Sequence, residues 1–428
     1  MPMERALVRL LRSQVLRAAS SPSRLQRGVL GRGLPSQVRE YAASTSSSDG
    51  VSRTELSESL FGSRQPVWQG WSRGYSSASG LEHLSINSQE KVDPFSLVAD
   101  ELQVVANRLR SMVTAEVPVL ALAAEYFFKM GVEGKRFRPM VLLLMSTALM
   151  TTPAHGLQDL IFDDLRLRQQ RIAEITEMIH VASLLHDDVL DHADTRRGIS
   201  SLNSMMGNKL AVLAGDFLLA RASVALASLR NTEVVELLSK VLEHLVTGEI
   251  MQLSSEPKDM SNMDYYMQKT FYKTASLMAN SCKAIAVLGG QPEEVALHAF
   301  DYGRHLGLAY QLVDDALDYT GTTKTLGKPA LSDLGQGIVT APVLFALKEF
   351  PEMSKLIQRK FKTATDRNQA VEMVKESRGI AQTHELAAEH AQKAVDAIDS
   401  LPPNPSLQVQ QCRRALIDIA HQVITRSK

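Results

Sequence analysis

A long stretch without proline most restricts what this chain can fold into. No proline occurs between Pro153 and Pro257, and the stretch is rich in Leu, Ala, Glu and Lys. Because proline breaks the interior of a helix, its absence permits long helices. Apolar residues recur at steps of three and four, as at Leu237, Val241 and Leu245, which indicates amphipathic helices. The sequence therefore predicts an all-α fold, a single large helical domain.

The remainder of the chain from residue 93 onward has the same character. No segment alternates apolar and polar residues as strands do, and aromatic residues make up only 5% of the chain. Prolines stand instead where helices are expected to begin, at Pro139, Pro292, Pro329 and Pro342. The last amphipathic helix is predicted from Gln408 to Arg426. We expect one all-helical domain over 93–428, because nothing divides this segment into two.

The first 80 residues have a different composition. Residues 1–50 contain many arginines but only Glu4, Glu40 and Asp49 as acids, and a serine-rich stretch follows. Such a composition, with an amphipathic stripe, is typical of an organelle transit peptide. The segment Arg73-Gly74-Tyr75-Ser76-Ser77 resembles a mitochondrial processing site. We expect residues 1–80 to be a transit peptide and disordered linker that directs the chain to the mitochondrion, with the plastid second. A disordered basic tail is the alternative.

Charge and cysteine content argue against several classes of protein. The 47 Lys and Arg balance the 47 Asp and Glu, so we expect no nucleic-acid partner held by bulk positive charge. Cys282 and Cys412 are far apart and form neither a disulfide framework nor a metal knuckle, which favours a reducing compartment. No apolar run reaches the roughly 18 residues that a membrane span needs. The longest, from Val141 to Met150, has the length of a core helix.

Two acidic clusters carry the strongest chemical signal. The pattern D-D-x-x-D occurs at 187–191 and again at 314–318, each time beside apolar, helix-forming sequence. On a helix, the first and last aspartates of each cluster share a face, where like charges repel unless something neutralises them. Oxygen ligands without cysteine select a hard cation, Mg²⁺ or else Mn²⁺. A single copy could be a charged surface turn, but two copies indicate metal bridges that hold a polyphosphate. The carboxylates predicted to bind metal are those of Asp187, Asp191, Asp314 and Asp318.

Basic residues accompany the acidic clusters. Lys135 and Arg138 lie where a helix is predicted to begin, with Pro139 in its first turn, and a helix N-terminus beside cations is a natural anion site. Further cations follow each cluster or lie between them, at Arg196, Arg197, Lys273 and Lys328. The chain thus offers metal ligands for one diphosphate and direct cationic contacts for another.

These motifs, in this order and spacing, resemble those of the trans-polyprenyl diphosphate synthases, the isoprenyl diphosphate synthase family. The similarity covers about residues 93 to 428 and is greatest to the organelle-targeted solanesyl and geranyl diphosphate synthases of plants. The motifs that carry it are Gly134-Lys135-Arg136-Phe137-Arg138-Pro139, Ile179 to Asp191, Asp194-Thr195-Arg196-Arg197-Gly198, Gly215-Asp216, Lys273-Thr274, Gln311 to Asp315 with Asp318, and Leu326-Gly327-Lys328-Pro329.

The resemblance implies a single large helical bundle around a central cavity, and a role for each matching residue. The diphosphate of isopentenyl diphosphate would be bound by Lys135, Arg138, His180 and Arg197. The allylic diphosphate would be contacted by Arg196, Lys273, Thr274, Gln311 and Lys328. Catalysis would depend on Asp187, Asp191, Asp314 and Lys273. It also implies a homodimer, for which Ala211–Leu229 is a candidate interface that could equally be core. Many relatives have lysine where this chain has Ile338, so no cation is expected in that loop.

The residues just before the first cluster bear on product length. In short-chain relatives bulky aromatic residues there block the growing tail, whereas here Ala182 and Ser183 are small. An open tunnel and a long, solanesyl-type product for the ubiquinone side chain are therefore favoured. Small residues could equally serve close helix packing.

Other activities are consistent with part of the pattern. A short-chain geranyl diphosphate synthase is the first alternative. A non-catalytic partner subunit should lack one acidic cluster, yet both are intact. A class I terpene cyclase should carry Asn/Asp-x-x-Ser/Thr-x-x-x-Glu as its second motif, which the second cluster does not match. A phosphate hydrolase is weaker still, because the chain has no His-rich site or P-loop.

Overall fold

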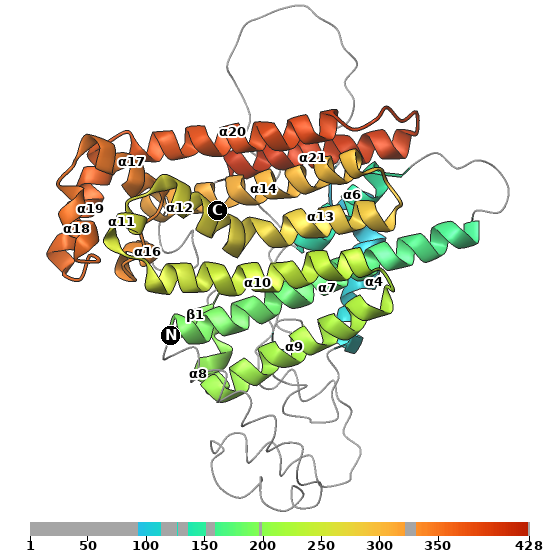
Figure 1. Ribbon diagram of the computed structural model, residues 1–428, viewed down its shortest axis with the longest axis horizontal. Coiled ribbons are helices and arrows are strands. Elements are labelled where there is room, and N and C mark those ends of the chain that lie inside the picture. Colours follow the sequence, from blue (N-terminus) through green and yellow to red (C-terminus); the bar gives the residue numbers. More distant parts are fainter. Residues whose placement is uncertain are drawn as a thin grey trace, which may run out of the picture. The chain divides into compact units, whose positions relative to one another are not determined.

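Long helices packed along one another make up the bundle (Figure 1). The computed structural model describes residues 93–112, 126, 136–150, 159–196, 199–321 and 331–426. The longer helices are α4 (Ala99–Met112), α6 (Phe137–Ala148), α7 (Asp159–Leu190), α9 (Asn208–Ser228), α10 (Thr232–Ser254), α13 (Ser276–Leu288), α14 (Glu293–Thr320), α19 (Ala364–Glu376), α20 (Gly379–Asp399) and α21 (Leu407–Thr425). The predicted all-α fold is confirmed.

Shorter elements connect these helices. They are the 3₁₀ turn η1 (Ser96–Val98), the helices α8 (Leu202–Met206), α11 (Pro257–Met260), α12 (Met263–Thr270), α16 (Ser332–Gly335), α17 (Ala341–Glu349) and α18 (Met353–Gln358), the π-helical turn η2 (Phe271–Ala275), and the strands β1 (Thr195–Arg196) and β2 (Ile199–Ser200). The two strands pair antiparallel, with Thr195 opposite Ser200. Each strand has only two residues, which is too short to produce the alternating pattern by which strands are predicted.

The sequence signals for helix ends correspond to real ends. Pro292 is the N-cap residue of α14, and Pro342 lies in the first turn of α17. Helix α21 (Leu407–Thr425) differs by one residue at each end from the predicted helix. Pro329 lies outside the described residues, as does the whole predicted transit peptide.

Helix α14 is the packing centre of the bundle. It packs against α13 and α20, and Figure 1 shows it running between them. Close approach to α13 requires glycine, because a Cβ on Gly303 would lie 2.7 Å from the Cα of Ala279. Cys282 on α13 and Cys412 on α21 are both free and buried.

Helix α9 corrects one expectation. It is long and apolar enough to cross a membrane by length and composition, although the sequence had suggested that no run reaches that length. It was overlooked because Asp216 and Arg221 interrupt its apolar residues. Only 39% of its most apolar window is buried. Much of this apolar surface is therefore exposed in the single chain.

A histidine pair joins α14 to α20. The Nδ1 atoms of His305 and His390 lie 2.8 Å apart, and the rings stack at a centroid distance of 5.1 Å. Burial, together with the nearby Arg304 and Lys393, lowers the pKa of both rings to about 4, while Glu389 acts in the opposite direction. Both rings are therefore neutral at pH 7, and one donates its proton to the other.

This pair should make the stability of the fold depend on pH. In the unfolded chain each histidine would bind a proton near its ordinary pKa of about 6.5, so the unfolded state binds more protons between pH 6.5 and about 4 and stability falls as pH falls. The double variant His305→Gln/His390→Gln should lose this dependence. Urea unfolding measures how much lower the free energy of unfolding of the double variant is than that of the wild type. This difference should be smaller at pH 5 than at pH 7 by on the order of 1 kcal/mol.

His298→Gln, two turns earlier on α14, is the matched control and should keep the wild-type dependence. A deficit of the double variant that stays constant across this pH range would contradict the assignment.

Candidate active site

The two acidic clusters lie at the same end of the bundle. Asp187 is in the last turn of α7, and Asp191 follows the helix directly, with its N–H donating to the Asp187 carbonyl at 2.8 Å. Asp314 and Asp318 lie in the last two turns of α14. Helices α7 and α14 run in the same direction, so these ends come to one side of the molecule (Figure 1). The packing thus brings together groups that are far apart in sequence.

The first cluster is partly shielded from water: Asp188 is buried, Asp187 is half-buried and Asp191 is exposed. Burial is the largest cause of a rise in the pKa of the Asp187 carboxyl to about 6, and the neighbouring carboxylates of Glu249 and Asp191 contribute to this rise, whereas Lys273 opposes it. Burial likewise raises the pKa of Asp191. Carboxylates that are desolvated and close to other carboxylates gain from a nearby cation. The cluster is therefore a site where bound positive charge would be stabilised.

The second cluster contains a hydrogen-bond network. Asp315 is 2% exposed and accepts hydrogen bonds from the Tyr266 hydroxyl and from Nε2 of Gln311, the latter at 2.8 Å. Burial raises the pKa of Asp315 to about 7, and these two hydrogen bonds oppose the rise. Asp318 is 1% exposed. Asp315 thus orients Gln311, while Asp314 lies near the surface of the cluster.

A π-helical turn links the two clusters. In η2, Lys273 forms a salt bridge with Glu249 and donates to Gln252 Oε1 at 3.2 Å, and its charge acts on Asp187 and Asp191. The next residue, Thr274, donates to Gln311 Oε1 at 3.0 Å. A π-helical turn widens the backbone, and such turns are frequent at functional sites. The adjacent residues Lys273 and Thr274 can therefore act on different parts of one site, Lys273 on the first cluster and Thr274 on Gln311 beside the second.

Two further predicted residues are held by ion pairs. Arg196 pairs with the buried carboxylate of Asp188, with Nη2 2.6 Å from Oδ1, and the β1–β2 hairpin supports this arginine. Asp314 pairs with Arg426, whose Nη2 lies 2.6 Å from Oδ1 and whose guanidinium stacks over Tyr310. In this structure the carboxylates of both clusters thus have cationic side chains as neighbours.

Arg138 and His180 form a separate pair. Arg138 Nη1 lies 3.0 Å from His180 Nε2, which joins α6 to α7. Both were predicted to bind one diphosphate, and they do lie together. Three other residues predicted to bind diphosphates lie outside the described residues: Lys135, Arg197 and Lys328.

The predicted length-determining residues lie beneath the first cluster. Ala182 is fully buried on α7, and the Ser183 hydroxyl donates to the His180 carbonyl at 2.9 Å. Nearer the cluster, His186 packs over Gly215, where a Cβ would lie 2.2 Å from its ring nitrogen. Any side chain at position 215 would therefore have to displace the His186 ring.

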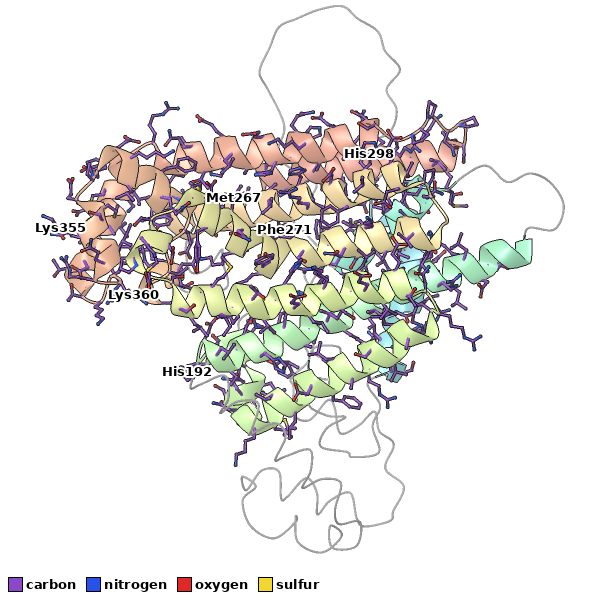
Figure 2. All side chains as sticks on the ribbon, viewed as in Figure 1. His192, Met267, Phe271, His298, Lys355 and Lys360 are labelled. Carbon is purple, nitrogen blue, oxygen red and sulfur yellow. The ribbon has the colours of Figure 1, made fainter. Side chains whose placement is uncertain are left out.

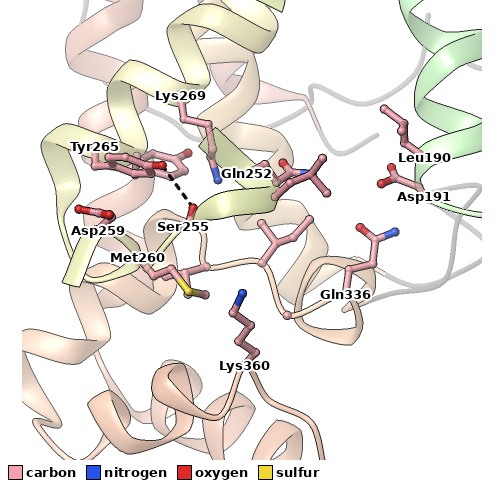
Figure 3. A pocket seen from close by; sticks show the side chains of 15 residues that line it. Leu190, Asp191, Gln252, Ser255, Asp259, Met260, Tyr265, Lys269, Gln336 and Lys360 are labelled. Carbon is pink, nitrogen blue, oxygen red and sulfur yellow. Dashed lines mark hydrogen bonds between the residues drawn. The ribbon is translucent and has the colours of Figure 1, made fainter. Parts of the chain in front are cut away.

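A cavity opens beside the first cluster (Figure 3). Its volume is about 320 Å³, and its lining includes Asp191, Gln252, Lys269, Ile338 and Lys360. Burial lowers the pKa of the Lys269 ammonium, and the carboxylate of Asp315 raises it. Ile338 contributes an apolar side chain to this lining, and Lys269 and Lys360 supply positive charge from other elements.

Several groups of this site were not predicted from the sequence. Lys269 lies one helical turn before Lys273, and that spacing could have suggested it. No local sequence pattern marks Glu249 or Arg426. Each has a role only because its element, α10 for Glu249 and the end of α21 for Arg426, packs beside a cluster.

The donor set is compatible with Mg²⁺ that is only partly coordinated by protein. Among the described residues, no group of three or more His, Cys, Asp or Glu side chains is arranged to enclose a metal. Mg²⁺ usually takes one or two carboxylates and completes its shell with water and phosphate oxygens. Asp187 and Asp191 on one helix end and Asp314 on the other fit that mode, with a phosphate between them.

Comparison with known proteins decides the family. The family model described as polyprenyl synthetase matches residues 117–377. The chain belongs to the polyprenyl synthetase family. It is 59% identical over 345 residues to the mitochondrial solanesyl-diphosphate synthase 1 of Oryza sativa subsp. japonica, covering 80% of each chain. It is 55% identical over 388 residues to the chloroplastic/mitochondrial solanesyl diphosphate synthase 3 of Arabidopsis thaliana, covering 90% of each.

Solved structures of the polyprenyl synthetase type agree with this fold. An apo medium/long-chain prenyl pyrophosphate synthase of Arabidopsis aligns with a TM-score of 0.66 and 53% identity, over 79% of this chain and 100% of that one. A polyprenyl synthase of Caulobacter crescentus, complexed with calcium and isoprenyl diphosphate, aligns with a TM-score of 0.68 and 30% identity, over 78% and 97%.

Proposed function

We propose that this protein is a long-chain, solanesyl-type trans-polyprenyl diphosphate synthase that condenses isopentenyl diphosphate with allylic diphosphates for the ubiquinone side chain. The observation that carries the proposal is the placement of two partly desolvated carboxylate clusters at one end of the bundle, joined by η2. The similarity to solanesyl diphosphate synthases supports the long product. The chemistry of prenyl transfer follows from these charges.

Mg²⁺ bound through Asp187, Asp191 and Asp314 would neutralise the charge that develops on the leaving diphosphate. Lys273 and Arg196 lie close enough to the first cluster for their charges to act on Asp187, and they would exchange their present carboxylate partners for phosphate oxygens. Thr274 and Gln311 would orient the same diphosphate by hydrogen bonds. Positive groups fixed where negative charge develops lower the barrier because they need no reorganisation.

Arg138 and His180 would hold the second substrate. The Arg138 guanidinium and the His180 ring N–H suit the diphosphate group of isopentenyl diphosphate. Binding that group would position the double bond of this substrate to face the allylic carbon. The apolar residues around Ala182 would exclude water, which would otherwise capture the allylic cation. The departing diphosphate is a reasonable base for the final proton, since no side chain of the site is needed for that step.

The two clusters should both be necessary for turnover. Asp187→Asn and Asp314→Asn each remove a charge that holds metal, and each should lower the elongation rate by about 100-fold or more even at saturating Mg²⁺. The assay supplies isopentenyl diphosphate, an allylic diphosphate and Mg²⁺, and the products are dephosphorylated and sized.

Asp163→Asn, exposed near the start of α7, is the control and should keep the wild-type rate. Wild-type rates in both active-site variants would refute the proposal. Elongated products also separate this activity from a cyclase, a hydrolase and a non-catalytic subunit.

Product length should respond to the volume of residue 182. Ala182→Phe places a ring one and a half helical turns before Asp187, in the expected path of the tail, and should shorten the main product by several isoprene units. Because only folded enzyme makes product, the length distribution is informative even if the variant is less stable. Ala182→Val should give an intermediate or unchanged length. A full-length product from Ala182→Phe would contradict the tunnel.

We further propose that two copies associate through α9 and α10. These helices expose Leu213 (57%), Val224 (69%), Val246 (65%) and Ile250 (56%), and exposed apolar patches mark interaction sites. In α10, Val246, Ile250 and Leu253 follow a helical repeat on one face. A second copy would cover this surface, which explains the low burial of α9.

Charge on this surface should break the dimer. Leu213→Glu/Ile250→Glu should elute as a monomer in size-exclusion chromatography with light scattering, whereas Leu297→Glu, also exposed but on α14, should remain dimeric. A wild-type monomer, or wild-type protein that floats with lipid vesicles, would argue against the proposal.

We place the enzyme in the mitochondrion, with the plastid possible, and assign residues 1–80 to a transit peptide. The composition of this segment supports the assignment, and related synthases are named mitochondrial or chloroplastic/mitochondrial.

A further inference from the structure

Two lysines that form no salt bridge with any described residue lie at the cavity beside the first cluster. Figure 3 shows Lys269 and Lys360 directed into the cavity from opposite walls. Within the described ranges neither ammonium group forms a salt bridge, whereas Lys273 nearby is paired with Glu249. Asp191 and Asp259 are the acidic residues of the lining. Two cations facing each other across a cavity that adjoins a metal-binding carboxylate indicate a site for an anion.

Lys360 is held at this cavity by an unusual backbone. Lys360 and Phe361 both adopt positive φ, 53° and 49°, which non-glycine residues rarely do. Phe361 is 1% exposed and anchors the turn in the core. Such conformations persist only where the surroundings enforce them, and they concentrate at functional sites.

The same turn touches the loop that carries Ile338. Gly337 has φ of 78°, and a Cβ at this position would lie 2.9 Å from the Lys360 carbonyl oxygen and 3.3 Å from its Cβ. The backbone of Lys360 is therefore in direct contact with the residue before Ile338. Ile338 presents an apolar side chain to the cavity, so its loop contributes no positive charge there. Lys360, in the connection between α18 and α19, supplies that charge instead.

We infer that Lys360 binds the diphosphate group of the allylic substrate. This inference rests on the proposed function. The allylic diphosphate is chosen because the cavity includes Asp191, while Arg138 and His180, assigned to the other substrate, are not in its lining. A flexible lysine at the cavity mouth can reach a phosphate oxygen on the face away from the metals, and Lys269 would contact the same group from the opposite wall.

Kinetics of Lys360→Gln test this inference. The KM for the allylic diphosphate should rise about tenfold, as expected for one lost charge-assisted hydrogen bond at a partly exposed site, while the KM for isopentenyl diphosphate stays within about twofold of the wild type. Lys360→Arg should restore most of the affinity. Lys355→Gln, an exposed lysine on neighbouring α18 (Figure 2), is the matched control and should change neither constant.

A compensating substitution separates charge from local structure. Adding Ile338→Lys to Lys360→Gln should recover the lower KM, because it returns a cation to the same cavity from the adjoining loop. An unchanged KM for the allylic substrate in Lys360→Gln, or an equal rise for both substrates, would overturn the inference.

A binding measurement tests the role of Lys360 without requiring turnover. Calorimetry with inorganic diphosphate and Mg²⁺ should show about tenfold weaker binding to Lys360→Gln than to the wild type and to Lys355→Gln. If wild-type protein binds magnesium diphosphate in this way but elongates no prenyl chain, the proposed function fails and the role of Lys360 stands. Equal binding by all three proteins would refute the role of Lys360 alone.

Discussion

Desolvation of carboxylates governs this structure. Each cluster gathers aspartates at the end of a helix, and burial of part of each cluster raises the pKa of Asp187 to about 6 and that of Asp315 to about 7. An arrangement of this kind costs stability unless cations are close by. The fold supplies cations on every side, and the same arrangement is suited to holding metal and diphosphate.

The cations beside the clusters differ in how firmly they are held. Arg196 makes a close ion pair with a buried aspartate, Lys273 is paired with a glutamate, and Arg426 reaches Asp314 from the end of the last helix. Lys269 and Lys360 face a cavity instead. We interpret the first group as charges that exchange partners when substrate binds, and the second as charges that await an anion.

Sequence reasoning anticipated what depends on local pattern. Helix α21 and the proline-marked helix starts follow from periodicity and from the fixed φ of proline, and the two aspartate clusters were found because their spacing matches a helical turn. Residues whose role depends on tertiary packing could not be found. Glu249 comes from a separate helix, and Lys360 reaches the cavity only through a turn of unusual backbone conformation. The length of the apolar stretch in α9 was underestimated because charged residues interrupt it.

The central claim is that both carboxylate clusters bind metal around one shared diphosphate. Anomalous diffraction from crystals grown with Mn²⁺ and inorganic diphosphate measures this directly. The account predicts Mn²⁺ peaks beside the carboxylates of Asp187 and Asp191 and beside that of Asp314, all in contact with the same diphosphate. Mn²⁺ bound elsewhere, or a diphosphate in contact with neither cluster, would contradict it.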